Sequence, residues 1–76
     1  MLKIVEEFER KQGRKPKKVG SLRGYDLISG GRYIKVKAKK EEIFITENEW
    51  LTAKRLRNKY FIYLVDERGK IEILKV

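Results

Sequence analysis

Three charged side chains on one short stretch could act on a phosphate group: Asp26, Lys35 and Lys37. They flank the Gly30-Gly31 pair, which lies between runs of Val, Ile, Tyr and Leu and is typical of a β-hairpin turn. Side chains alternate along a strand, so Lys35 and Lys37 share one face, and the Asp26 carboxylate is close enough across the hairpin to meet one of them. This arrangement predicts either a solvated sheet face or a site for a polyanion.

Composition restricts the chemistry that this chain could perform. It has 76 residues with neither Cys nor His, which excludes disulfides, thiolate metal sites and an imidazole general base. Catalysis would have to use carboxylates, lysines and a borrowed metal ion. Twenty Lys and Arg against eleven Asp and Glu give a net charge of +9, which favours nucleic acid or another anionic partner over plain solubility. The charged fraction of 41% is also frequent in heat-adapted proteins.

The length predicts a single domain over residues 1–76, with one compact core and no deep substrate cavity. No apolar run approaches the roughly 20 residues of a membrane span, so no membrane partner is expected. The glutamates near the N-terminus argue against a secretory signal. We therefore expect a cytoplasmic protein.

The first two segments are a helix and a basic run. Apolar residues at helical spacing predict a helix from Met1 to Gln12, ended by Gly13. Its buried stripe is expected to consist of Met1, Ile4, Val5 and Phe8. From Arg10 to Tyr25 the chain carries seven basic residues and no acid, so this segment should stay extended or mobile unless an anion collects it. The alternative is a solvated loop.

The hairpin spans Gly24 to Lys37, and a short third strand is expected at Ile43-Phe44-Ile45. Thr46-Glu47-Asn48-Glu49 matches a capping box, in which the Thr hydroxyl and the Glu carboxylate each bond the other's backbone N–H. The second helix should run from Glu47 to about Asn58. Its buried row is expected to be Trp50, Ala53 and Leu56.

Two strands complete the expected fold. The apolar run Tyr60 to Val65 predicts a central buried strand, followed by a turn at Asp66 to Gly69. The last strand should span Ile71 to Val76, with Ile71 and Ile73 facing inward. The predicted class is α/β (α+β), in the order α-β-β-β-α-β-β, with helices packed on a mixed sheet.

Several phrases, in order over nearly the whole chain, resemble one family. They are Glu9-Arg10 with Gly13-Arg14 and Pro16, Gly24-Tyr25-Asp26, Arg32 to Lys37, Thr46 to Trp50 with Ala53 and Leu56, and Tyr60 to Tyr63. Together they resemble the DUF3883, or "protein NO VEIN" C-terminal, domain of the restriction-endonuclease-like PD-(D/E)XK superfamily. Such domains are often appended to helicases and to prokaryotic defence proteins.

This resemblance implies a nuclease-type core in which two carboxylates hold a divalent metal and a lysine helps to activate water. Asp26 falls on the family's aspartate, Lys37 on its lysine and Glu9 on a glutamate of the first helix. The family's second carboxylate is Lys35 here, which leaves Asp26 as a weak metal ligand. A unit cation ~4 Å from a dication costs roughly 8 kcal/mol at an effective dielectric near 20.

Lys35 in place of the family's second carboxylate favours a degenerate nuclease fold that binds nucleic acid. DNA is the expected partner, and no cofactor is expected. The expected phosphate-binding residues are Arg14, Lys15, Lys17, Lys18, Arg23, Lys35, Lys37, Lys39, Lys54 and Arg55. One alternative is an active endonuclease that uses Mg²⁺ or Mn²⁺ with Asp26, Glu9 and Lys37, the missing carboxylate coming from Glu41, Glu42 or Glu49. Another is a protein-interaction or homodimer module that pairs through the last strand. Lys35 could also be a harmless surface lysine.

Overall fold

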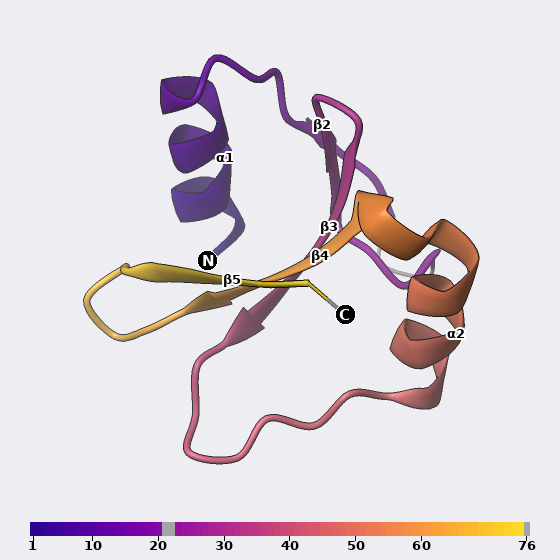
Figure 1. The fold of residues 1–76 in the computed structure, drawn as a ribbon. Helices are drawn as coiled ribbons and strands as arrows, with labels where there is room; N and C mark the ends of the chain where they lie inside the picture. Colours follow the sequence, from indigo (N-terminus) through magenta and orange to yellow (C-terminus); the bar gives the residue numbers. More distant parts are fainter. Residues whose placement is uncertain (21–22, 76) are drawn as a thin grey trace.

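The computed structural model describes residues 1–20 and 23–75. Two helices and five strands follow one another along the chain (Figure 1). They are α1 (Leu2–Lys11), β1 (Lys17–Lys18), β2 (Leu27–Ser29), β3 (Arg32–Ala38), α2 (Glu47–Leu56), a 3-10 turn η2 (Arg57–Lys59), β4 (Tyr60–Val65) and β5 (Ile71–Lys75). None of the helices in these ranges is long and apolar enough to cross a membrane.

The strands form one mixed sheet in the order β1-β2-β3-β4-β5. β3 and β4 run parallel, and the other neighbouring pairs are antiparallel. A parallel pair needs a crossover, and α2 supplies it. Figure 1 shows α1 and α2 on opposite sides of the sheet, so both faces are covered. The predicted α+β class with helices packed on a mixed sheet is confirmed.

The predicted hairpin is present. Ser29 pairs with Arg32 across a turn made of Gly30 and Gly31, whose φ angles of 54° and 82° are both positive. Two positive φ angles give a two-residue turn whose twist matches that of the flanking strands, and glycine adopts them without steric cost. The glycine pair therefore determines the register that brings the residue before β2 close to the middle of β3.

The core has two parts because the sheet is buried on both faces. On the α1 side it consists of Val5, Leu27, Ile34, Val36, Tyr63 and Val65. On the α2 side it consists of Tyr25, Ala53, Tyr60, Ile62 and Leu64. β4 contributes to both parts, as expected for a continuous apolar run with a neighbouring strand on each edge. The prediction of a central buried strand over Tyr60–Val65 is confirmed.

The predicted strand at Ile43-Phe44-Ile45 is wrong. This segment has no regular secondary structure, and the side chain of Phe44 is 74% exposed. Both edges of β3 are already paired, with β2 and β4, so the segment that follows β3 has no free edge beside it. The remaining strand is instead β1, which pairs antiparallel with β2 at Lys17 and Lys18.

Each helix buries only part of its predicted row. Val5 and Phe8 of α1 and Ala53 and Leu56 of α2 contact the core as predicted. In α1 the residues that meet the core are Leu2, Val5 and Phe8, whereas Met1 and Ile4 are 58% and 38% exposed. In α2 the buried residues are Glu49, Thr52 and Ala53. Trp50, which was expected in the buried row, is 51% exposed. In α2 the rule that large apolar residues face inward fails for Trp50, because the hydrogen-bonded polar residues Glu49 and Thr52 occupy inward positions.

β5 lies at the edge of the sheet, and its exposure differs from the prediction at one position. Ile71 packs against the α1-side core, but Ile73 is 39% exposed because an edge strand lacks a neighbour on one side. Val76, which the prediction included in this strand, lies outside the described residues.

α2 is docked through a contact with a glycine. Gly24 has a φ of 81°, and a Cβ placed on it would overlap the hydroxyl oxygen of Thr52. The Tyr60 hydroxyl donates a hydrogen bond to the Gly24 carbonyl at 2.7 Å. The backbone that leads into Asp26 is thus held between α2 and β4.

We predict that Gly24→Ala destabilises the fold more than Gly31→Ala does, as measured by urea unfolding. Both glycines have a φ near 80°, at 81° and 82°, but a Cβ on Gly31 meets no atom within 4 Å. An alanine in the left-handed backbone region lowers the free energy of unfolding by about 1–2 kcal/mol at either site. Overlap with Thr52 adds a further loss of about 1–3 kcal/mol at Gly24 alone. Equal losses of stability would contradict the close packing of α2 on Gly24.

Candidate functional site

Asp26 is held rigidly between neighbouring segments. Its backbone N–H donates to the Ile34 carbonyl at 2.8 Å, and its carbonyl accepts from the Val19 N–H at 3.0 Å. Its carboxylate is 2.9 Å from the Val36 backbone nitrogen and 3.5 Å from the Lys35 ammonium. The predicted contact between Asp26 and a lysine of the hairpin is confirmed, and the lysine is Lys35.

Lys37 is tied to a second carboxylate. Its ammonium lies 2.9 Å from Glu49 Oε1 and 3.0 Å from the Phe44 carbonyl oxygen. Glu49 also accepts from the Thr46 N–H, and the Thr46 hydroxyl accepts from the Glu49 N–H, both at 3.1 Å. The predicted capping box is confirmed. The contact with Lys37 adds a bond from the start of α2 to the middle of the sheet.

Asp26, Lys35, Lys37 and Glu49 are called here the lysine–carboxylate cluster. Lys35 and Lys37 share the α2-facing side of β3, and with Glu49 they line one shallow hollow. Burial raises the pKa of Tyr60, and the negative charges of Glu49 and Asp26 raise it further. The formal charges of the cluster cancel, since two ammonium groups meet two carboxylates.

A divalent ion at Asp26 would have to displace the Lys35 ammonium. Hard cations prefer several oxygen ligands, and the second carboxylate of the cluster already bonds Lys37 and the helix cap. Over residues 1–20 and 23–75, no three acidic side chains gather closely enough to hold a metal ion. The lysine–carboxylate cluster therefore offers two separate carboxylates, each neutralised by a lysine.

Glu9 lies on the other side of the sheet. It is fully buried, and its oxygens are 2.5 and 2.9 Å from the Arg14 guanidinium nitrogens and 2.8 Å from the Tyr63 hydroxyl. Burial alone raises the pKa of Glu9, but the hydrogen bonds from Arg14 and Tyr63 outweigh it, and the pKa lies below its ordinary value of 4.5. Tyr63 belongs to the α1-side core, so the structure does not bring Glu9 to the lysine–carboxylate cluster.

Some of the predicted phosphate-binding residues already have partners. Arg14 packs over the turn glycine Gly30, as well as on Glu9. Lys39 lies 2.7 Å from Glu72, in a pair in which both side chains are about half exposed. Such an exposed pair is weak, so Lys39 can still exchange its carboxylate for another anion.

The basic residues on and around β1 remain exposed. They are Lys15, Lys17, Lys18 and Arg23. None of the ion pairs among the described residues involves them. The segment Arg10 to Tyr25 carries no acid, so every charged residue that this segment contributes is basic. Lys54 and Arg55 add exposed charge on α2.

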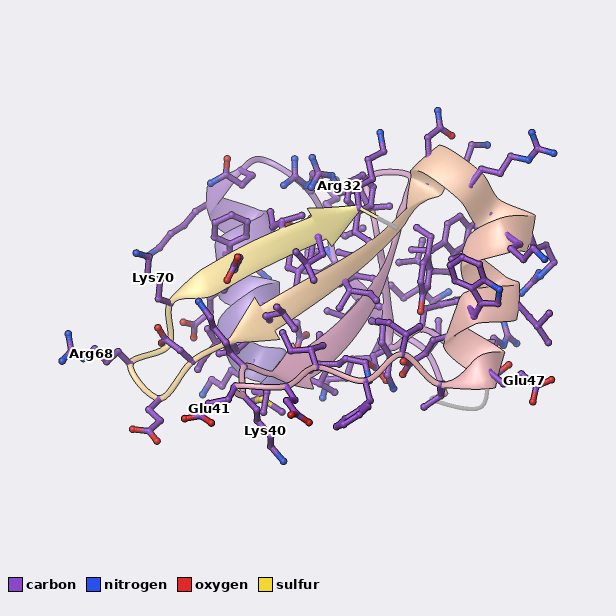
Figure 2. The ribbon with its side chains drawn as sticks, turned by 60° about the horizontal axis from the view of Figure 1, so that its bottom comes forward. Arg32, Lys40, Glu41, Glu47, Arg68 and Lys70 are labelled. Carbon is purple, nitrogen blue, oxygen red and sulfur yellow. The ribbon has the colours of Figure 1, made fainter. Side chains whose placement is uncertain are left out.

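The opposite end of the sheet differs, because it carries charges of both signs. Figure 2 shows Lys40 and Glu41 after β3, and Arg68 and Lys70 at the turn between β4 and β5. A shallow hollow at this end is lined by Lys39, Lys40, Glu41, Asp66, Glu67 and Arg68. A surface of mixed sign is a poor match for a polyanion.

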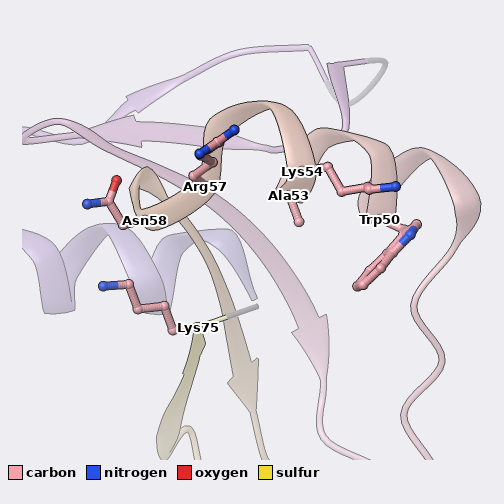
Figure 3. A pocket seen from close by; sticks show the side chains of 6 residues that line it. All are labelled: Trp50, Ala53, Lys54, Arg57, Asn58 and Lys75. Atoms are coloured by element: carbon pink, nitrogen blue, oxygen red, sulfur yellow. The ribbon is translucent and has the colours of Figure 1, made fainter.

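Sequence reasoning missed one feature, a hollow beside the exposed Trp50 (Figure 3). It is lined by Trp50, Ala53, Lys54, Arg57, Asn58 and Lys75. The capping box was only a partial signal, because it engages Glu49 without showing that this residue faces the sheet. A buried Glu49 at the third helical position directs the next residue, Trp50, away from the sheet.

The family model for "Protein NO VEIN, C-terminal" matches residues 1–76. The chain belongs to this family. The resemblance inferred from short phrases of sequence is thus confirmed at the level of the NO VEIN C-terminal family. No curated protein and no solved structure gives a significant match.

We predict that Glu9→Gln lowers the free energy of unfolding at neutral pH by roughly 2–4 kcal/mol, because it leaves the Arg14 guanidinium without its buried partner. The folded-state pKa of Glu9 is depressed, so its stabilisation is full above the ordinary value of 4.5 and is lost as pH falls through the folded value. The difference between the variant and the unaltered chain should therefore shrink below pH 4.5.

Urea unfolding over a pH series measures this effect. Glu7→Gln on the same helix is the matched control, because it removes the same charge from an exposed side chain. A Glu9→Gln deficit that stays constant into acid would contradict the assignment of a depressed pKa to Glu9.

Proposed function

We propose that this chain is a nucleic-acid-binding domain with DNA as the expected partner. Its Lys and Arg side chains contact the phosphates of the nucleic-acid backbone. The observation that carries the proposal is the acid-free set of exposed bases around β1, namely Lys15, Lys17, Lys18 and Arg23. Each of these cations that neutralises a phosphate releases condensed counterions, which is the main source of sequence-independent affinity. The net charge of +9 supports the same partner.

We further propose that the core is a degenerate, restriction-endonuclease-like nuclease. The support is the contact between Asp26 and Lys35, because the resemblance expects a carboxylate where Lys35 stands. An ammonium beside Asp26 supplies the positive charge that a metal ion would otherwise supply. The cluster then stabilises the fold, and phosphate binding relies on cations that have no internal carboxylate partner.

The binding proposal predicts a steep dependence on salt. Fluorescence anisotropy with a labelled random duplex should show affinity falling by roughly 0.9 log unit per log unit of salt for each phosphate contacted. In Lys17→Glu/Lys18→Glu the slope should decrease by roughly 1.8 if both lysines contact phosphates. Their backbones, rather than their side chains, pair with β2, so the strand can persist.

Arg68→Glu/Lys70→Glu is the matched control, because it changes the net charge equally at the mixed-sign end of the sheet. It should retain most of the affinity and slope. Binding that is insensitive to salt, or equal losses in the two double variants, would refute a phosphate-binding edge at β1.

The degenerate-site proposal predicts that Lys35→Glu creates a metal site. The new carboxylate would stand beside Asp26, which is already oriented by the Val36 N–H, and two carboxylates suit Mg²⁺ or Mn²⁺. Calorimetry with Mn²⁺ should show binding to Lys35→Glu and little to the unaltered chain or to Asp26→Ala/Lys35→Glu. Absence of binding to Lys35→Glu would mean that the cluster is not a former metal site.

The alternative that the chain is an active endonuclease is tested by a cleavage assay. Plasmid and branched DNA, incubated with the unaltered chain and Mg²⁺ or Mn²⁺, would be cut, and the cleavage would vanish in Asp26→Ala. That result would replace the binding proposal by an active endonuclease with a rearranged carboxylate set.

Self-association is a second candidate, favoured by the position of β5 at the sheet edge and by the exposure of Ile73. Charged Glu72 and Lys75 on the same strand oppose edge-to-edge pairing. Sedimentation at two protein concentrations separates a dimer from a monomer.

A further inference from the structure

The hollow beside Trp50 lies where the second half of α2 and the 3-10 turn η2 approach the end of β5. Ala53, which is 5% exposed, belongs to the core behind it. Figure 3 shows Trp50 and Lys54 on one side of Ala53, and Asn58 and Lys75 on the other. The small side chain of Ala53 leaves room between these larger groups.

Trp50 presents an aromatic face to solvent instead of filling the core. It is 51% exposed and belongs to neither part of the core. The Lys54 ammonium lies 5.9 Å from the centre of its ring, at the outer limit of a cation–π contact. An exposed indole beside a cation favours a planar ligand that can stack on the ring and carries negative charge.

The charges that line the hollow are all positive. Lys54, Arg57 and Lys75 come from α2, η2 and β5, and no acidic side chain takes part in the lining. The Lys75 ammonium lies 5.9 Å from the centre of the Phe61 ring, which packs on the α1-side core, so Lys54 and Arg57 are the cations available to a ligand on Trp50. None of these three cations forms an ion pair within the described residues. Asn58 adds an amide that can both donate and accept hydrogen bonds. A planar group with a phosphate beside it satisfies both the aromatic and the cationic parts of this surface.

We propose that the hollow binds an unpaired nucleobase of a single-stranded segment, with the base stacked on Trp50 and its adjoining phosphates held by Lys54 and Arg57. Stacking on an exposed aromatic ring tolerates any base, because every base has a flat face. A base inside an intact duplex cannot reach the ring, so this site engages strand ends, gaps or single strands. The inference rests on the proposed function, since it names the part of the nucleic acid that α2 contacts.

Trp50 is the single tryptophan of the chain, so its fluorescence reports on this hollow directly. Titration with oligothymidylate should quench the emission in a saturable manner. Polyglutamate carries negative charge without bases and should leave the emission nearly unchanged. Equal quenching by the two polymers would overturn the stacking proposal, because charge alone would then explain binding.

Substitution provides the second test. Trp50→Ala should weaken the binding of labelled oligothymidylate by about tenfold or more, as measured by anisotropy, and Trp50→Phe should recover part of the loss. Leu51→Ala is the control, because Leu51 is 54% exposed on the same helix but does not line the hollow. Unchanged affinity in Trp50→Ala would overturn the inference.

The two proposals fail in different ways. Lys17→Glu/Lys18→Glu should lose duplex binding while oligothymidylate still quenches Trp50, and this result supports two separate contact surfaces. Duplex binding that persists without any quenching of Trp50 overturns the inference alone. If neither duplex DNA nor oligothymidylate binds at low salt, the inference and the proposed function are both overturned.

Discussion

The two ammonium groups of β3 lie at the junction between the sheet and α2, and the rest of the structure depends on the carboxylates that meet them there. Lys35 and Lys37 face α2 because side chains alternate along β3 and Ile34 and Val36 fill the α1-side core. Their side chains are about one-fifth exposed, so an unpaired charge there would be costly. Asp26 and Glu49 remove that cost, and they connect the hairpin, the sheet and the start of the second helix.

This requirement divides the basic residues into two groups. Arg14, Lys35 and Lys37 are partly buried, and each has a carboxylate within the fold. The lysines of β1 and the cations around Trp50 have none among the described residues, so they can exchange solvent counterions for phosphates. A net charge alone does not distinguish these groups, because residues of both kinds occur in the same short stretches of sequence.

Local patterns were sufficient for much of the fold and for part of the site. The glycine pair predicted the hairpin and hence the contact between Asp26 and a lysine, because a two-residue turn determines which residues face each other. The capping box predicted the start of α2 and the engagement of Glu49. The strand assigned at Ile43-Phe44-Ile45 failed, because strand formation requires a free neighbouring edge and hydrophobicity does not report one.

The hairpin, the helix cap, the doubly buried strand β4 and the excess of positive charge could all be predicted from the order of the residues. Each of them follows from contacts between residues that are near in the chain or from composition. The buried face of each helix, the carboxylate that each lysine meets and the position of the unpaired cations depend on contacts between residues far apart in the chain. Glu49 turns inward because Lys37, twelve residues away, lies opposite it, and this contact leaves Trp50 facing solvent. Contacts such as that between Lys37 and Glu49 depend on how the crossover helix α2 packs on the sheet. No local pattern of residue types encodes this packing.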